Sequence, residues 1–126
     1  MNGLSLSYIG DAYYELIIRK YLIGLGLQNV DILHKRAVKF VSSVAQASIL
    51  KYFIDNKLVT EEEISIYKRA RNATTQSRKH VDASTYGKAT GFEAIIGNLY
   101  LNNIKRCDEL IEIAIKFIEE RTTDGK

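Results

Sequence analysis

Three acidic side chains stand among apolar residues in segments that read as helices. Asp11 and Glu15 belong to YIGDAYYE, residues 8–15, and Glu93 belongs to TGFEAIIG, residues 90–97. Burying an ionised carboxylate among apolar neighbours is costly unless a cation or a hydrogen-bond donor compensates it. Two such acids on two crossing helices could hold a hard divalent cation, and Mg²⁺ commonly takes one or two carboxylates and keeps several waters.

Glycines accompany both acidic segments. Gly10 precedes Asp11, while Gly91 and Gly97 bracket Glu93. A glycine inside a helix costs about 1 kcal/mol relative to alanine, so it is expected where another part of the molecule approaches the backbone closely. The pattern therefore predicts that the two helices cross tightly. A divalent cation at that crossing could activate water and stabilise charge on a phosphoryl oxygen, as in a metal-dependent phosphodiesterase.

Each of these residues also has a purely structural interpretation. Acids four positions apart share a helix face, so Asp11 and Glu15 also fit a solvated helix edge. Glu93 also fits an ordinary exposed helix position. One cysteine, Cys107, and two distant histidines give no zinc-ligand spacing, and we expect the histidines at the surface. Spacing alone leaves both interpretations open.

A basic stretch lies between the two acidic segments. It contains a single acid, Asp82, and six basic residues: Lys68, Arg69, Arg71, Arg78, Lys79 and Lys88. Local basic charge on a protein with a net charge of only +3 is typical of a surface that binds a phosphate-rich partner. A plain solvated loop is the alternative.

Composition places the chain among ordinary globular proteins. It has 126 residues, of which 46% are hydrophobic and 26% charged, enough for one domain with one core. No apolar run approaches the roughly 18 residues that a membrane span needs, and no signal peptide is visible. With a single cysteine, we expect a cytoplasmic protein without membrane contact.

Hydrophobic periodicity predicts an all-α fold of six helices in one domain, residues 1–126. We expect Asp31 to cap the second helix, and Thr60 with Glu63 to form a capping box at the fourth. The fifth helix should begin near Ser84 or Thr85. The expected helices are Leu4–Leu22, a second through ILHKRAVKFV, Val44–Ile54, a fourth ending near Ala70, a fifth through YGKATGFEAIIGNLYL, and Arg106–Glu120; a polar loop, NATTQSRKHVDAS, precedes the fifth.

The two acidic segments resemble the motifs of the ribonuclease III family. YIGDAYYE is similar to its signature helix, E-F-L-G-D-A, and GFEAIIGNLYL to its second motif, D-x-x-E-A-x-x-G-x-x-Y-L. The chain most resembles Mini-ribonuclease III, the short branch without a double-stranded-RNA-binding domain. LHKRAVKFVSSVAQA and RARNATT are also similar to that branch. The resemblance covers nearly the whole chain and implies a ribonuclease III-like endonuclease domain.

The resemblance implies which acids act. Asp11 and Glu93 match the family's two central catalytic metal ligands for Mg²⁺, with Mn²⁺ as a possible substitute. Two further acids of the larger enzymes are replaced, one by Ser7 and one by Thr90, so the number of ions stays open. Thr90 and Glu15 are secondary candidates, and Glu15 has no invariant counterpart in the family.

The resemblance also implies the activity and its partners. We expect a homodimer, with Tyr8 at the interface, that cleaves double-stranded RNA to 5′-phosphate and 3′-hydroxyl ends. Precursor large-subunit ribosomal RNA is the expected substrate, with a ribosomal protein assisting. Without a separate RNA-binding domain, Lys68, Arg69, Arg71, Arg78 and Lys79 should grip the RNA backbone. An inactive rRNA-binding scaffold and a helical protein-interaction domain are the alternatives.

Overall fold

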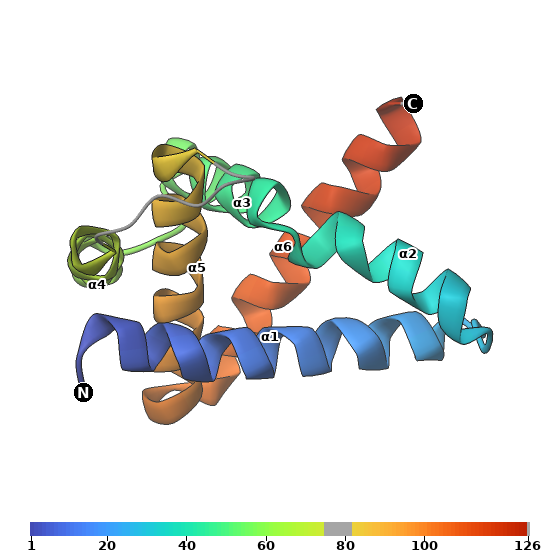
Figure 1. Cartoon of the computed structure of the whole chain (residues 1–126), viewed down its shortest axis with the longest axis horizontal. Coiled ribbons are helices and arrows are strands. Elements are labelled where there is room, and N and C mark those ends of the chain that lie inside the picture. Colours follow the sequence, from blue (N-terminus) through green and yellow to red (C-terminus); the bar gives the residue numbers. More distant parts are fainter. Residues whose placement is uncertain (75–81, 126) are drawn as a thin grey trace.

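The computed structural model describes residues 1–74 and 82–125, with side chains up to residue 121. These residues form helices joined by short connections and contain no strand, so the predicted all-α fold class is confirmed (Figure 1). The helices are α1 (Gly3–Gly24), α2 (Val30–Val41), α3 (Ser43–Asp55), α4 (Glu61–Ala73), α5 (Ala83–Asn102) and α6 (Ile104–Gly125).

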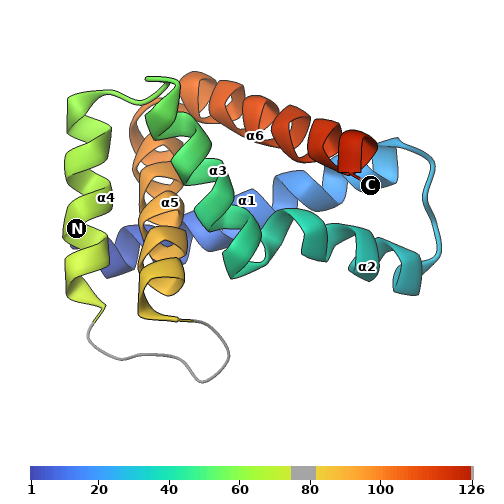
Figure 2. The same ribbon diagram turned by 90° about the horizontal axis from the view of Figure 1, so that it is seen from above.

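Helix α5 is the central element. It contacts α1, α3, α4 and α6, and Figure 2 shows it between α3 and α4, with α1 crossing at one side. Its buried residues occupy nearly every face of the helix, as expected for one surrounded by others. They are Gly87, Ala89, Thr90, Gly91, Phe92, Ala94, Ile95, Ile96, Gly97 and Leu99.

Helices α1 and α5 touch backbone to backbone. A Cβ atom added to Gly10 would lie 1.8 Å from the carbonyl oxygen of Glu93, and one added to Gly97 would lie 1.9 Å from that of Leu6. No side chain fits at these distances, so the crossing requires glycine at both positions. The predicted tight crossing is therefore confirmed for Gly10 and Gly97. Gly91 faces α4 instead, where its added Cβ would meet the ring of Tyr67 at 2.1 Å.

Aromatic side chains fill the core around this crossing. Tyr14 is fully buried, packs edge-on against Phe92 with ring centroids 5.0 Å apart, and donates a hydrogen bond to the Phe40 carbonyl at 2.9 Å. A partly buried ion pair anchors α6 to α4, because Arg106 donates to both carboxylate oxygens of Glu63, at 2.6 and 2.8 Å. These contacts fix α2, α4 and α6 around the α1–α5 pair.

Helix starts follow the capping side chains, and the residue that caps α2 differs from the prediction. The capping box of Thr60 and Glu63 is confirmed. Asn29, rather than Asp31, caps α2 by accepting from the Ile32 amide at 3.1 Å, so the prediction for Asp31 was wrong. Asp31 instead lies in the first turn, where its charge favours the helix dipole.

The fifth and sixth helices begin earlier than predicted. Asp82 caps α5 by accepting from the Thr85 amide at 2.7 Å, so the helix begins at Ala83. Asn103 ends α5 and caps the next helix, which begins at Ile104 rather than at Arg106. Helix α4 runs on to Ala73 because nothing before that residue interrupts it. Within the described part of the chain, no helix combines the length and apolarity of a membrane span.

The backbone contact between α1 and α5 predicts that one methyl group added at Gly10 strongly destabilises the fold. Gly10→Ala should lower the free energy of unfolding by about 3 kcal/mol or more, because the backbones must separate to admit the Cβ. Gly24→Ala is the matched control. Gly24 lies in the last turn of the same helix, and nothing lies within 4 Å of its added Cβ.

Urea denaturation of both variants tests this expectation. Gly24→Ala should leave stability unchanged or raise it by up to about 1 kcal/mol, since alanine favours the helix. Equal stability of Gly10→Ala and the wild type would contradict the backbone contact.

Candidate active site

A pocket of about 290 Å³ lies where α1, α3 and α5 meet. Helix α1 contributes Asp11 and Ser7, α5 contributes Glu93 and Thr90, and α3 contributes Gln46. We call this pocket the acid site. The structure thus brings together the two acids that the sequence predicts as partners, because the glycine crossing seats the two helices against each other.

The Glu93 carboxylate is half-buried and held by neighbours on other helices. Ser7 donates a hydrogen bond to its Oε1 at 3.0 Å. Burial, the negative charge of Asp11 and a hydrogen bond with Asp11 raise the pKa of Glu93 to about 8, against the opposing effect of hydrogen bonds from Ser7 and Gln46. At neutral pH this carboxyl therefore retains a proton when no cation is bound.

The donors of the acid site suit a hard cation. Among the described residues no group of three or more acids, histidines or cysteines is placed to hold a metal ion, so the described charged groups of the acid site are two carboxylates. The polar side chains around them also carry oxygen atoms, and they include Ser7, Ser43, Gln46 and Thr90. Two acids that repel each other gain from a shared divalent ion, which favours the ionised form of both. The site thus fits Mg²⁺ with waters completing its coordination.

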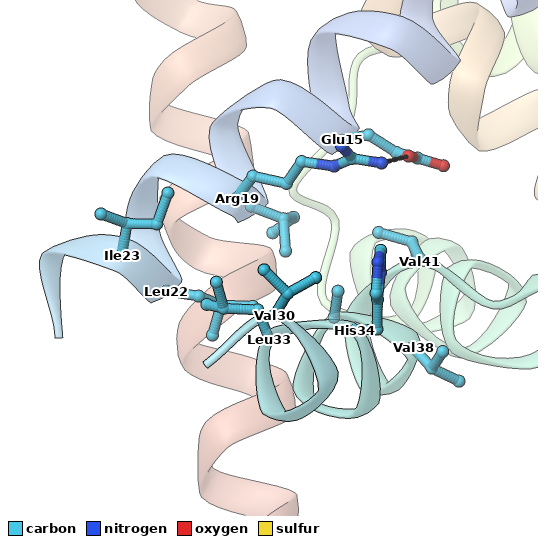
Figure 3. Close-up of a pocket in the computed structure, with 11 residues that line it drawn as sticks. Glu15, Arg19, Leu22, Ile23, Val30, Leu33, His34, Val38 and Val41 are labelled. Atoms are coloured by element: carbon cyan, nitrogen blue, oxygen red, sulfur yellow. Dashed lines mark hydrogen bonds and ion pairs between the residues drawn. The ribbon is translucent and has the colours of Figure 1, made fainter. Parts of the chain in front are cut away.

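The secondary candidates lie in different places. Thr90 lines the acid site, and its hydroxyl donates to the Tyr86 carbonyl at 3.0 Å. Glu15 lines a separate apolar groove between α1 and α2 and pairs with Arg19 at 3.3 Å (Figure 3). The structure therefore groups Thr90, and not Glu15, with Asp11 and Glu93.

The basic candidates divide into three groups. Lys68 and Arg69 are exposed on α4. Arg71 is half-buried: its guanidinium lies 5.2 Å from the centre of the Tyr67 ring, and its side chain covers Gly87 of α5. Arg78 and Lys79 lie outside the described residues. Arg71 thus helps to pack α4 on α5 as well as carrying charge.

Gln46 is the site residue that sequence reasoning missed. It is only 2% exposed, and its Nε2 donates to the Val41 carbonyl at 3.3 Å. In the sequence it is a polar residue on the buried stripe of α3, one position after Ala45 and three before Ile49. That signal was available, but only the tertiary structure shows that the side chain lines the same pocket as the two acids.

Comparisons with known proteins agree with this geometry. Residues 4–103 match the model of the Ribonuclease III domain family. A Mini-ribonuclease 3 from Acholeplasma laidlawii is 50% identical over 125 residues, covering 99% of this chain and 100% of that protein. One from Enterococcus faecalis is 45% identical over 122 residues, covering 95% of this chain and 92% of that protein.

A solved structure shares the fold as well. The crystal structure of a Fusobacterium nucleatum protein superposes with a TM-score of 0.82 at 37% identity, covering 92% of this chain and 93% of that one. The chain belongs to the ribonuclease III family. The predicted endoribonuclease class and the single ribonuclease III-like domain are thereby confirmed.

The raised pKa of Glu93 predicts how stability depends on pH without metal. The unfolded carboxyl has a pKa near 4.5 and the folded one near 8, so the folded state binds more protons between these values. Stability should therefore be highest below about pH 4.5, as far as this group is concerned, and fall as pH rises toward 8. Each kcal/mol lost should lower Tm by roughly 4 °C.

Thermal melts in a chelating buffer between pH 5 and 9 measure this effect. Glu93→Gln should flatten the decline, because the amide does not titrate. Asp11→Asn should shift it to lower pH, since the neighbouring charge is gone. A wild-type profile that coincides with that of Glu93→Gln would contradict a raised pKa.

Proposed function

We propose that this chain is a Mg²⁺-dependent endoribonuclease that hydrolyses phosphodiester bonds of double-stranded RNA at the acid site. The observation that carries the proposal is the meeting of Asp11 and Glu93, from motifs far apart in sequence, in one pocket. Family membership supports an endoribonuclease acting on duplex RNA. The metal, these site residues and residues 1–126 as one catalytic domain are part of the proposal.

The chain's own residues have separate roles in this reaction. Asp11 and Glu93 would hold Mg²⁺, which when bound activates water and neutralises charge on the scissile phosphate. Asp11 positions the attacking water, while Ser7 keeps Glu93 oriented through the bond to Oε1. Hydrolysis forms a bond from the water oxygen to phosphorus and breaks the bond from phosphorus to the 3′ oxygen, which takes up a proton, so the products carry a 5′-phosphate and a 3′-hydroxyl.

Cleavage of duplex RNA should depend on both acids. Asp11→Asn and Glu93→Gln should each lower kcat at least about 100-fold, because the metal's stabilisation of the transition state is worth several kcal/mol. The assay is cleavage of an end-labelled RNA duplex with Mg²⁺, followed by analysis of the product ends.

Two exposed acids provide matched controls for this assay. Asp31→Asn and Glu112→Gln change the same functional groups outside the acid site and should cleave like the wild type. Full activity of Asp11→Asn would contradict the metal assignment. An inactive scaffold is favoured if the wild type binds duplex RNA but cleaves none with Mg²⁺ or Mn²⁺. Ser7 and Thr90, where larger family members carry acids, are the observation behind that second candidate.

The exposed basic side chains of α4 are proposed to bind the RNA backbone. Lys68 and Arg69 belong to α4, which packs against α5, the helix that carries Glu93. We propose the same role for Arg71, Arg78 and Lys79. Phosphate contacts of this kind confer affinity with little sequence preference.

Salt titrations measure these contacts. Lys68→Ala and Arg69→Ala should each weaken RNA binding and reduce the slope of log K against log salt by about 1, since each removes one phosphate contact. Lys105→Ala removes an exposed charge outside the basic stretch and should leave the slope unchanged. If the slope is unchanged in all three variants, α4 is not part of the RNA-binding surface.

We propose that two chains associate through the exposed face of α1. Tyr8 is 83% exposed, and Leu4 and Leu16 of the same helix are also exposed. Positions spaced by four lie on one face of a helix, and large apolar side chains gathered there suggest a contact surface. A symmetric dimer would place two acid sites on one duplex.

Sedimentation velocity tests the dimer. Tyr8→Asp should convert dimers to monomers, because a charge would be buried at the interface. Leu101→Asp alters an exposed apolar residue of α5 and should leave the dimer intact. A monomeric wild type at micromolar concentration would contradict the proposal.

The biological setting extends the proposal. Precursor large-subunit ribosomal RNA as substrate, assistance by a ribosomal protein and a cytoplasmic location remain predictions from the family resemblance. Mapping the ends of large-subunit ribosomal RNA in cells that lack the gene would test the substrate. If these ends are the same as in wild-type cells, this RNA is excluded as the substrate.

A further inference from the structure

Gln46 is a buried polar residue of the acid site that lies outside the two acidic motifs. Its side chain is 2% exposed on a helix whose other buried residues are Ala45, Ile49, Leu50 and Phe53. An amide buried among apolar residues is costly unless it forms hydrogen bonds. Its position therefore indicates a specific role for its polar atoms.

The side-chain amide of Gln46 lies between one hydrogen-bond partner, the Val41 carbonyl, and the acid site. Its Nε2 donates to the Val41 carbonyl, which belongs to the last turn of α2 and has no acceptor role within that helix. Gln46 also lines the acid site beside Glu93, and its side chain lowers the pKa of that carboxyl. An amide nitrogen has two hydrogens, so one group can serve both acceptors.

We propose that Gln46 is a positioning residue of the acid site, whose amide holds the Glu93 carboxylate facing Asp11 from the side of α3. The inference rests on the proposed function and deepens it. Ser7 holds Glu93 from α1, at 3.0 Å, and Gln46 holds it from α3. Neutral side chains from two helices thus orient one of the two acids that the described residues bring to this site. Groups that orient metal ligands typically contribute 10–100-fold to metal affinity or activity.

The position of Gln46 also ties the acid site to the α2–α3 junction. Ser42 caps α3 by accepting from the Ala45 amide at 3.1 Å, and Val41, the residue before it, accepts from Gln46. Both Val41 and Ser43 line the acid site. One amide therefore fixes the wall of the pocket and the acid within it.

Gln46→Met removes the amide and keeps the length of the side chain. Gln28→Met, at an exposed position between α1 and α2, is the matched control. Mn²⁺ binding is measured without RNA, from the decrease in the electron paramagnetic resonance signal of the hydrated ion. This readout is independent of cleavage. Steady-state cleavage of duplex RNA gives kcat and KM, and thermal melts report the fold.

Gln46→Met should weaken Mn²⁺ binding and lower kcat by about 10–100-fold, with KM for RNA within about twofold of the wild type. Gln28→Met should match the wild type in every measurement. If Gln46→Met loses thermal stability but retains wild-type Mn²⁺ affinity and kcat, Gln46 only caps α2 and the inference is overturned. A wild type that binds no Mn²⁺ and cleaves no RNA would instead overturn the proposed function.

Discussion

The backbone contact between α1 and α5 is the constraint on which the acid site depends. Gly10 and Gly97 let the two helices approach so closely that a carbonyl oxygen of each helix occupies the space that a Cβ atom of the other would need. Each glycine neighbours the chemistry in sequence: Gly10 precedes Asp11, and Gly97 follows Glu93 by one helical turn. The same contact that closes the core therefore determines the separation of the two carboxylates.

The pairing of two acids that suits the acid site for a cation also lowers the stability of the folded protein without metal. Placing two acids in one half-buried pocket makes it costly to ionise both, so the pKa of Glu93 is raised and this carboxyl keeps its proton at neutral pH without metal. Neutral donors, Ser7 on α1 and Gln46 on α3, offset part of that cost without adding charge. A divalent cation would remove the repulsion, so metal binding and folding should stabilise each other.

The sequence predicted what depends on local pattern and on motif. The helical fold, the capping box of Thr60 and the pairing of Asp11 with a distant Glu93 could be inferred, the last through family resemblance. Choices between neighbouring side chains could not: Asn29 and Asp31 are both good caps, and only the folded backbone selects one. Gly91 packs against Tyr67, and Gln46 lines the acid site. Both positions depend on tertiary contacts, which hydrophobic periodicity in the sequence does not predict.

The central claim is that Asp11 and Glu93 act as one cation site. A double-mutant cycle on the Mg²⁺-induced rise in Tm tests it most directly, using wild type, Asp11→Asn, Glu93→Gln and the double variant. A shared ion predicts that either single substitution abolishes the rise and that the second adds nothing further. Independent, additive losses, or a full Mg²⁺ response in the double variant, would contradict a common site.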